Sequence, residues 1–95
     1  MYVEEFRVAA PLTADSAEEL LLAMIGYTSR ITVSGNGRSV HAPLLPTCLD
    51  VLRLRAGSVV TVTVEHGHRP EIDEDRLALR EFVDRFQALT GGQIP

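Results

Sequence analysis

The chain has 95 residues, of which 45% are hydrophobic and 23% are charged, so we expect a single globular domain over residues 1–95. A chain of this length buries a small core, and with no Trp and only 5% aromatic residues that core must consist mainly of Leu, Val, Ile and Ala. The net charge is −4, and the nine basic residues, all Arg, are scattered among thirteen acids, which argues against a nucleic-acid-binding surface.

Three features of the sequence favour a cytoplasmic protein without membrane contact. A single cysteine, Cys48, excludes an internal disulfide bond and is typical of a reducing compartment. The N-terminal stretch MYVEEFRV has no long apolar run, so we expect no signal peptide. The longest apolar run, LLLAMI, is far shorter than the ~20 residues that a membrane-spanning helix needs.

The first segment, residues 2–9 (YVEEFRVA), alternates in polarity with a period of two. This period predicts a strand whose Phe6 and Val8 side chains face the core. Pro11 has no amide hydrogen to donate to a sheet, so we expect the strand to end before it.

A capping box, Ser16-Ala17-Glu18-Glu19, predicts that the first helix begins at Ser16. Gly26 can adopt the left-handed conformation that closes a helix, so the helix should run to about that residue. The apolar residues of one helical stripe should face the core: Ala17, Leu20, Leu21 and Met24. Leu22 and Ile25 lie off that stripe and should leave apolar surface exposed.

Two alternating segments on either side of Gly35-Asn36-Gly37 predict a hairpin. The turn residues can supply the positive φ angles that a tight hairpin requires. The side chains expected to face inward are Ile31, Val33, Val40 and Ala42.

Three further elements are expected in the second half of the chain. Prolines are tolerated in a first helical turn, so a short helix should run from about Pro46 to Leu52 and be ended by Gly57. Residues 58–65 (SVVTVTVE) are rich in β-branched side chains and predict a strand. Residues 71–89 carry apolar side chains at helical spacing and predict the last helix.

The expected order of elements is β-α-β-β-α-β-α. Each element has one apolar face, and the simplest way to cover all of these faces is to place the helices on one side of a sheet. The sequence therefore predicts an α+β open-faced sandwich, in which three helices lie on one face of a four-stranded antiparallel sheet.

Two stretches of the chain, together with the order of elements, resemble a known family. GYTSRITVSGNGRSVHA is similar to the second and third strands of HPr, the histidine-containing phosphocarrier family of the bacterial sugar phosphotransferase system. LRLRAGSVVTV is similar to the end of that family's second helix and the glycine that leads into its fourth strand. The resemblance covers about residues 4–89 and implies an HPr-like fold.

The resemblance also implies where a functional site should lie. In that family a Gly-Leu-His-x-Arg-Pro motif begins the first helix, and its histidine takes a phosphoryl group from enzyme I and passes it to sugar-specific carriers. The helix amides and the arginine favour the bound phosphoryl group. In this chain the histidine falls on Thr13, the arginine on Asp15 and the proline on Ser16. We therefore expect a degenerate phosphoacceptor loop that cannot carry phosphate, and no catalytic residue.

The family's partner-docking face is formed by the starts of its first two helices. The residues that match this face are Ala14, Leu44, Leu45, Pro46 and Thr47. The regulatory serine found in some members falls on Leu44 or Leu45, neither of which can be phosphorylated. If one of these leucines is exposed, an apolar docking patch remains. The alternative is that a leucine fills the core beneath the second helix.

The remaining residues that could carry chemistry favour no metal and no cofactor. The pattern His66-Gly67-His68 with a distant His41 is a weak indication of a metal site. Asp73-Glu74-Asp75 lacks the spacing of a calcium loop and indicates a solvated helix start that suits the helix dipole. Cys48 has no base beside it in the sequence, so we expect a buried structural thiol.

These observations predict an HPr-like regulatory or protein-binding module that is not an enzyme and whose partner is a protein, with phosphotransferase-system components as candidates. One alternative is a self-associating structural subunit, such as a homodimer, in which Leu22, Ile25 and residues 43–49 are covered. Another is a phosphocarrier that uses a different residue, such as His41.

Overall fold

The computed structural model describes residues 2–65 and 74–91 of the chain. Its elements follow one another as β1 (Tyr2–Arg7), α1 (Ala14–Ala23), β2 (Arg30–Gly35), β3 (Arg38–His41), the 3-10 helix η1 (Ala42–Thr47), α2 (Leu49–Leu52), β4 (Val59–Glu65) and α3 (Glu74–Thr90). Within these two ranges, no helix has the length and apolar character needed to cross a bilayer.

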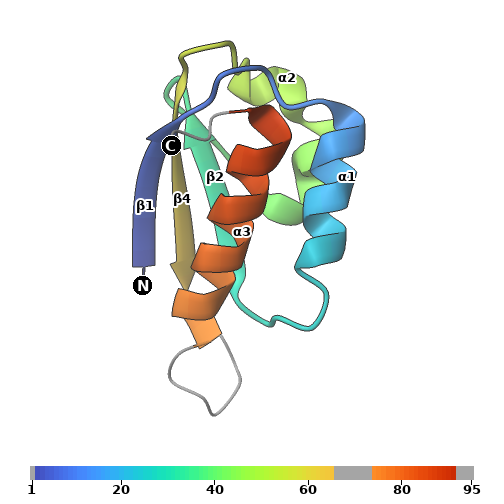
Figure 1. The fold of residues 1–95 in the computed structure, drawn as a ribbon, viewed down its shortest axis with the longest axis vertical. Coiled ribbons are helices and arrows are strands. Elements are labelled where there is room, and N and C mark those ends of the chain that lie inside the picture. The colour runs from blue at the N-terminus through green and yellow to red at the C-terminus, as the bar shows by residue number, and fades with distance from the viewer. Residues whose placement is uncertain (1, 66–73, 92–95) are drawn as a thin grey trace.

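The four strands form one antiparallel sheet in the order β1-β4-β2-β3. The helices lie on one face of this sheet, with α1 and α3 side by side (Figure 1). The predicted open-faced α+β sandwich is therefore confirmed. Its last strand in the sequence, β4, occupies an interior position between β1 and β2, so both halves of the chain are held by the same strand.

Side-chain alternation along the strands determines which face of the sheet is covered. In β4 the side chains of Val60, Val62 and Val64 are buried, while those of Thr61 and Thr63 on the other face are only partly covered. This is the period of two expected of a sheet with one buried face. Strand β1 ends at Arg7, two residues earlier than predicted; Phe6 within it is half-buried and Val8 just after it is buried, in agreement with their predicted inward orientation.

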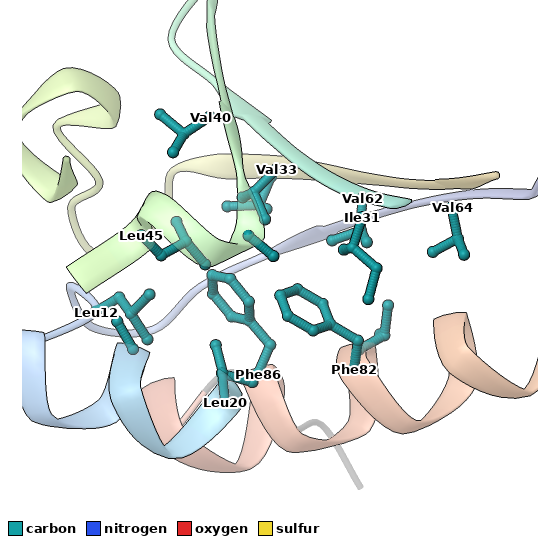
Figure 2. Packing of buried hydrophobic residues seen from close by; sticks show 14 of the residues in the cluster. Leu12, Leu20, Ile31, Val33, Val40, Leu45, Val62, Val64, Phe82 and Phe86 are labelled. Atoms are coloured by element: carbon teal, nitrogen blue, oxygen red, sulfur yellow. The ribbon is translucent and has the colours of Figure 1, made fainter. Parts of the chain in front are cut away.

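The core consists of aliphatic side chains from the sheet and aromatic side chains from α3. The ring of Phe86 meets those of Phe6 and Phe82 edge to face, with centroid distances of 5.3 and 5.9 Å. Such edge-to-face pairs are the favoured geometry for aromatic rings. Figure 2 shows Phe86 and Phe82 pointing from α3 toward the valine face of the sheet, with Leu45 of η1 nearby.

Several predicted element ends differ from those observed. Helix α1 ends at Ala23 rather than near Gly26, although Gly26 does have a positive φ of 102°. The predicted helix between Pro46 and Leu52 is divided into η1 and the short α2 at Cys48, whose backbone angles of −124° and 25° are not helical. Helix α2 is ended by Arg53, which has a left-handed conformation, and not by Gly57.

The hairpin between β2 and β3 is confirmed. Asn36 and Gly37 form its two-residue turn with φ angles of 53° and 79°. Positive φ at both central residues is the pattern of the turn whose twist matches that of the flanking strands. Asn36 tolerates this conformation better than most residues because its short polar side chain can bond locally.

The start of α3 corrects the prediction of a solvated acidic cluster. Asp73 lies outside the described residues, but Glu74 is only 4% exposed and Asp75 is half-buried. The Glu74 carboxylate accepts hydrogen bonds from the Thr28 amide at 2.5 Å and from the Thr28 hydroxyl at 2.9 Å. Asp75 accepts a hydrogen bond from the Ser29 hydroxyl at 2.5 Å. These bonds fasten the start of α3 to the segment that joins α1 to β2.

We expect Glu74→Ala to lower the free energy of unfolding by about 1–3 kcal/mol, because it leaves the Thr28 amide and hydroxyl without this acceptor. Glu81→Ala is the matched control, since Glu81 is half-buried on the same helix and pairs with Arg85 one turn away. That control should change stability by less than about 0.5 kcal/mol. Urea denaturation followed by circular dichroism measures both variants, and equal losses would contradict a special role for Glu74.

Candidate functional site

The candidate site is the start of α1, where the predicted degenerate phosphoacceptor loop lies. The residue before the helix, Thr13, has extended backbone angles and acts as the N-cap. Its Oγ1 accepts a hydrogen bond from the Ser16 amide at 3.1 Å, and its carbonyl oxygen accepts the first helical bond from the Ala17 amide at 2.8 Å. The Thr13 hydroxyl also donates to Ser16 Oγ at 3.1 Å.

This cap corrects the prediction that the helix begins at Ser16 with a box closed by Glu19. The helix begins at Ala14, so Ser16 lies inside the first turn and provides the amide that is capped. Leu12 is buried just before the cap, and Ala17 is buried just after it. A helix capped at Thr13 therefore buries both Leu12 and Ala17. A helix capped at Ser16 would leave residues 13–15 without the helical hydrogen bond that the Thr13 carbonyl oxygen accepts.

The charge at this helix start is negative. Asp15 is exposed in the first turn, and residues 10–20 contain no basic side chain. An acidic residue near a helix N-terminus interacts favourably with the partial positive charge of the amides. No cationic side chain in this stretch could pair with a bound anion. The arrangement is thus suited to stabilising the helix.

The two leucines of the predicted docking face have different environments. Leu45 is fully buried and lies in the core with Leu12 and Leu20 (Figure 2). It therefore fills the core and cannot contact a partner, which corrects its inclusion in an exposed face. Leu44 is 51% exposed. Leu45 is thus the leucine that fills the core, and Leu44 is the exposed one of the pair.

The other residues of the predicted docking face are at least partly accessible. Ala14 and Thr47 are exposed and Pro46 is half-buried. The Thr47 hydroxyl donates to the Leu44 carbonyl oxygen at 3.1 Å, which closes η1 and fixes the backbone of Leu44. Helix α1 packs directly against η1. Ala42 and Pro43 at the start of η1 line the same hollow as Met24 and Ile25, so the start of η1 lies beside the end of α1.

His41 lies away from the start of α1. It is exposed at the end of β3, and its Nδ1 is 3.3 Å from the Thr32 hydroxyl on the neighbouring strand. Its neighbours Val40 and Ala42 are buried, so alternation places His41 on the opposite face of the sheet from the helices. His66 and His68 lie outside the described residues. Among those described, no three His, Cys, Asp or Glu side chains form a group that could hold a metal ion.

Two apolar side chains at the end of the first helix are exposed, as predicted: Leu22 on α1 is 67% exposed, and Ile25, two residues beyond the helix, is 76% exposed. Ile25 also lines a hollow of about 620 Å³ between the end of α1 and the start of β2, together with Met24, Tyr27 and Ile31. Sequence reasoning did not identify this hollow, because its walls come from segments that are joined only by tertiary packing. Cys48 is half-buried against the core, not fully buried.

No model of a known protein family matches the chain, but solved structures share its fold. HPr-C-His from Thermoanaerobacter tengcongensis is 21% identical with a TM-score of 0.73, over 99% of this chain and 100% of that chain. The phosphocarrier protein HPr from Bacillus anthracis is 20% identical with a TM-score of 0.69, over 88% and 94%. The histidine-containing phosphocarrier protein of a Mycoplasma is 15% identical with a TM-score of 0.71, over 96% and 100%. The fold is therefore HPr-like.

We expect Thr13→Ala to destabilise the protein by about 1 kcal/mol, because it removes the hydroxyl that caps α1. Thr13→Asp should retain most of the stability, since a carboxylate can accept the same amide. Glu19→Ala is the control for the capping box and should change stability by less than about 0.5 kcal/mol. If Glu19→Ala proves as destabilising as Thr13→Ala in urea denaturation, the helix is capped at Ser16 and our assignment is wrong.

Proposed function

We propose that this chain is a relative of the phosphotransferase-system phosphocarriers that does not carry phosphate and acts as a regulatory, protein-binding module in the cytoplasm. The fold it shares with known phosphocarriers supports the relationship. The observation that carries the proposal is the capped start of α1. Thr13, the residue matched to the family's phosphoacceptor histidine, uses its hydroxyl to hold the helix.

The chemistry of this helix start supports the loss of phosphate transfer. A neutral imidazole is a good nucleophile near neutral pH, whereas a threonine hydroxyl is weak unless a base activates it. A phosphorylated threonine would be a stable ester and could not pass its phosphoryl group onward as a phosphohistidine does. Asp15 adds a negative charge in the same turn, which would repel an incoming phosphoryl group.

A docking role remains open to the surface around this site. Leu44 is exposed beside Pro46, and both lie on η1, which packs against α1. An exposed leucine on a backbone that is held by its own hydrogen bond can bind a partner without first being ordered. We therefore propose that Ala14, Leu44, Pro46 and Thr47 form the docking face, with Leu45 supporting it from the core.

We expect no acid-labile phosphate on this protein after incubation with enzyme I and labelled phosphoenolpyruvate, because the capped Thr13 offers no nucleophilic nitrogen. The measurement is intact mass before and after acid treatment, with an authentic HPr as the positive control in a parallel reaction. Acid-labile label on this chain would overturn the proposal. Mapping of that label to His41, His66 or His68 would then favour the alternative carrier.

We expect excess protein to slow phosphorylation of the authentic HPr by enzyme I, and Leu44→Glu to weaken this inhibition about tenfold or more because it places a charge at an apolar contact. Leu77→Glu is the matched control, since Leu77 is 47% exposed on α3 and lies outside the docking face. Equal weakening by both variants would contradict docking through η1.

The alternative of a self-associating structural subunit rests on the exposed Leu22 of α1 and the exposed Ile25 just after that helix. Light scattering during size-exclusion chromatography distinguishes it from docking. A tight dimer that Ile25→Glu dissociates, together with no inhibition of the HPr reaction, would favour the structural subunit over the docking module.

A further inference from the structure

Three arginines meet at a polar hollow that the chemistry of α1 does not involve. The hollow has a volume of about 590 Å³ and lies where the β2–β3 turn meets the end of α2. Arg38, Arg53 and Arg55 line it, and Asp50 is the one acidic residue in its lining. The local formal charge is therefore +2, in a chain whose net charge is −4.

Unlike Arg80 and Arg85 of α3, these arginines have no partner among the described residues. On α3, Arg80 pairs with Glu4 at 3.2 Å, and Arg85 pairs with Glu81 at 3.5 Å. The guanidinium groups of Arg38, Arg53 and Arg55, by contrast, form no hydrogen bond or ion pair with any residue in the ranges 2–65 and 74–91. Their donors are thus available to a ligand.

The backbone that carries these arginines is fixed by a set of specific bonds. The Asn36 side-chain amide donates to the Leu52 carbonyl oxygen at 2.6 Å and to the Arg53 carbonyl oxygen at 3.0 Å, which joins the hairpin turn to the end of α2. On the other side, Ser58 Oγ accepts from the Arg55 amide at 2.8 Å. The backbone around the hollow is therefore preorganised, and no free energy has to be spent on ordering it when a ligand binds.

Arg53 has a backbone conformation that arginine rarely adopts. Its φ and ψ angles are 52° and 47°, the left-handed region in which glycine or asparagine is favoured. Glycine would meet the conformational demand of this helix end at a lower cost. What arginine provides here, and glycine cannot, is a long cationic side chain at the edge of the hollow. Residues in such conformations are concentrated at functional sites.

We propose that this hollow binds the phosphate group of a small phosphorylated molecule, such as a phosphate monoester or a diphosphate. A guanidinium matches the geometry of phosphate oxygens through two parallel hydrogen bonds. The local charge of +2 matches a dianionic group, and the volume is within the range of small-molecule sites. The cluster is too small and local for the long basic surface by which nucleic acids are bound. This site does not depend on the proposed function of α1.

The test is a titration of the full-length, ¹⁵N-labelled protein with inorganic pyrophosphate, followed by amide resonances. We expect saturable shifts confined to the hairpin turn and residues 50–58. The double variant Arg38→Gln/Arg55→Gln should weaken binding about tenfold or more, because two charge-assisted contacts are lost. The matched control is Arg30→Gln/Arg85→Gln, which removes the same charge outside the hollow and should weaken binding less than about threefold.

Each other outcome would overturn the proposal. Equal weakening by the two double variants would indicate attraction by overall charge and no defined site. The absence of saturation at millimolar pyrophosphate would indicate no site for phosphate. Tighter binding of a hexaglutamate peptide than of pyrophosphate would assign the arginines to an acidic protein segment. The spectra of both variants report at once whether they are folded, so a folding defect cannot be mistaken for lost binding.

Discussion

The contact between the aromatic stripe of α3 and the valine face of β4 is the constraint on which the rest of the fold depends. Because β4 lies between β1 and β2, the side chains of Val60, Val62 and Val64 are enclosed on both sides and have no route to solvent. Phe82 and Phe86 cover them from above. With that layer in place, α1 buries its apolar side chains beside α3, and η1 packs against α1 and against strands β2 and β3.

The periodic parts of this architecture could be predicted from the sequence, because the apolar period directly reports which side chains face the core. The predictions that were wrong concern positions where two local conformations are both compatible with the sequence. Thr13 and Ser16 are both good N-caps, and burial of Leu12 selects the first. Glu74 was expected in solvent because acids at helix starts usually are, yet it continues the buried stripe of Ala78 and Phe82 at intervals of four residues.

The sequence predicted where the candidate docking face lies, but not which of its side chains are exposed. The phase of η1 decides which of two adjacent leucines is buried, and sequence patterns cannot resolve the phase of a single 3-10 turn flanked by prolines. The arginine hollow was missed for a different reason. Arg38 and Arg55 are seventeen positions apart in the chain, and the bonds of Asn36 to the end of α2 bring their segments together. A scattered distribution of arginines along a sequence therefore does not imply a scattered distribution on the surface.

Phosphate is usually held in proteins by a helix N-terminus or by a cluster of arginines. In this chain the helix N-terminus carries a negative side chain, and the arginine cluster is positive. At the start of α1, the Ser16 amide donates to the Thr13 hydroxyl, and Asp15 adds a negative charge in the same turn, where it interacts favourably with the helix dipole. At the end of α2, arginines that have no partner in the described part of the chain are carried by a backbone that is already held by hydrogen bonds. A helix N-terminus and an arginine cluster bind phosphate by independent physical means, so an HPr-like fold can lose the first without any consequence for the second. Loss of phosphate transfer and retention of phosphate binding are therefore compatible in one chain of this size.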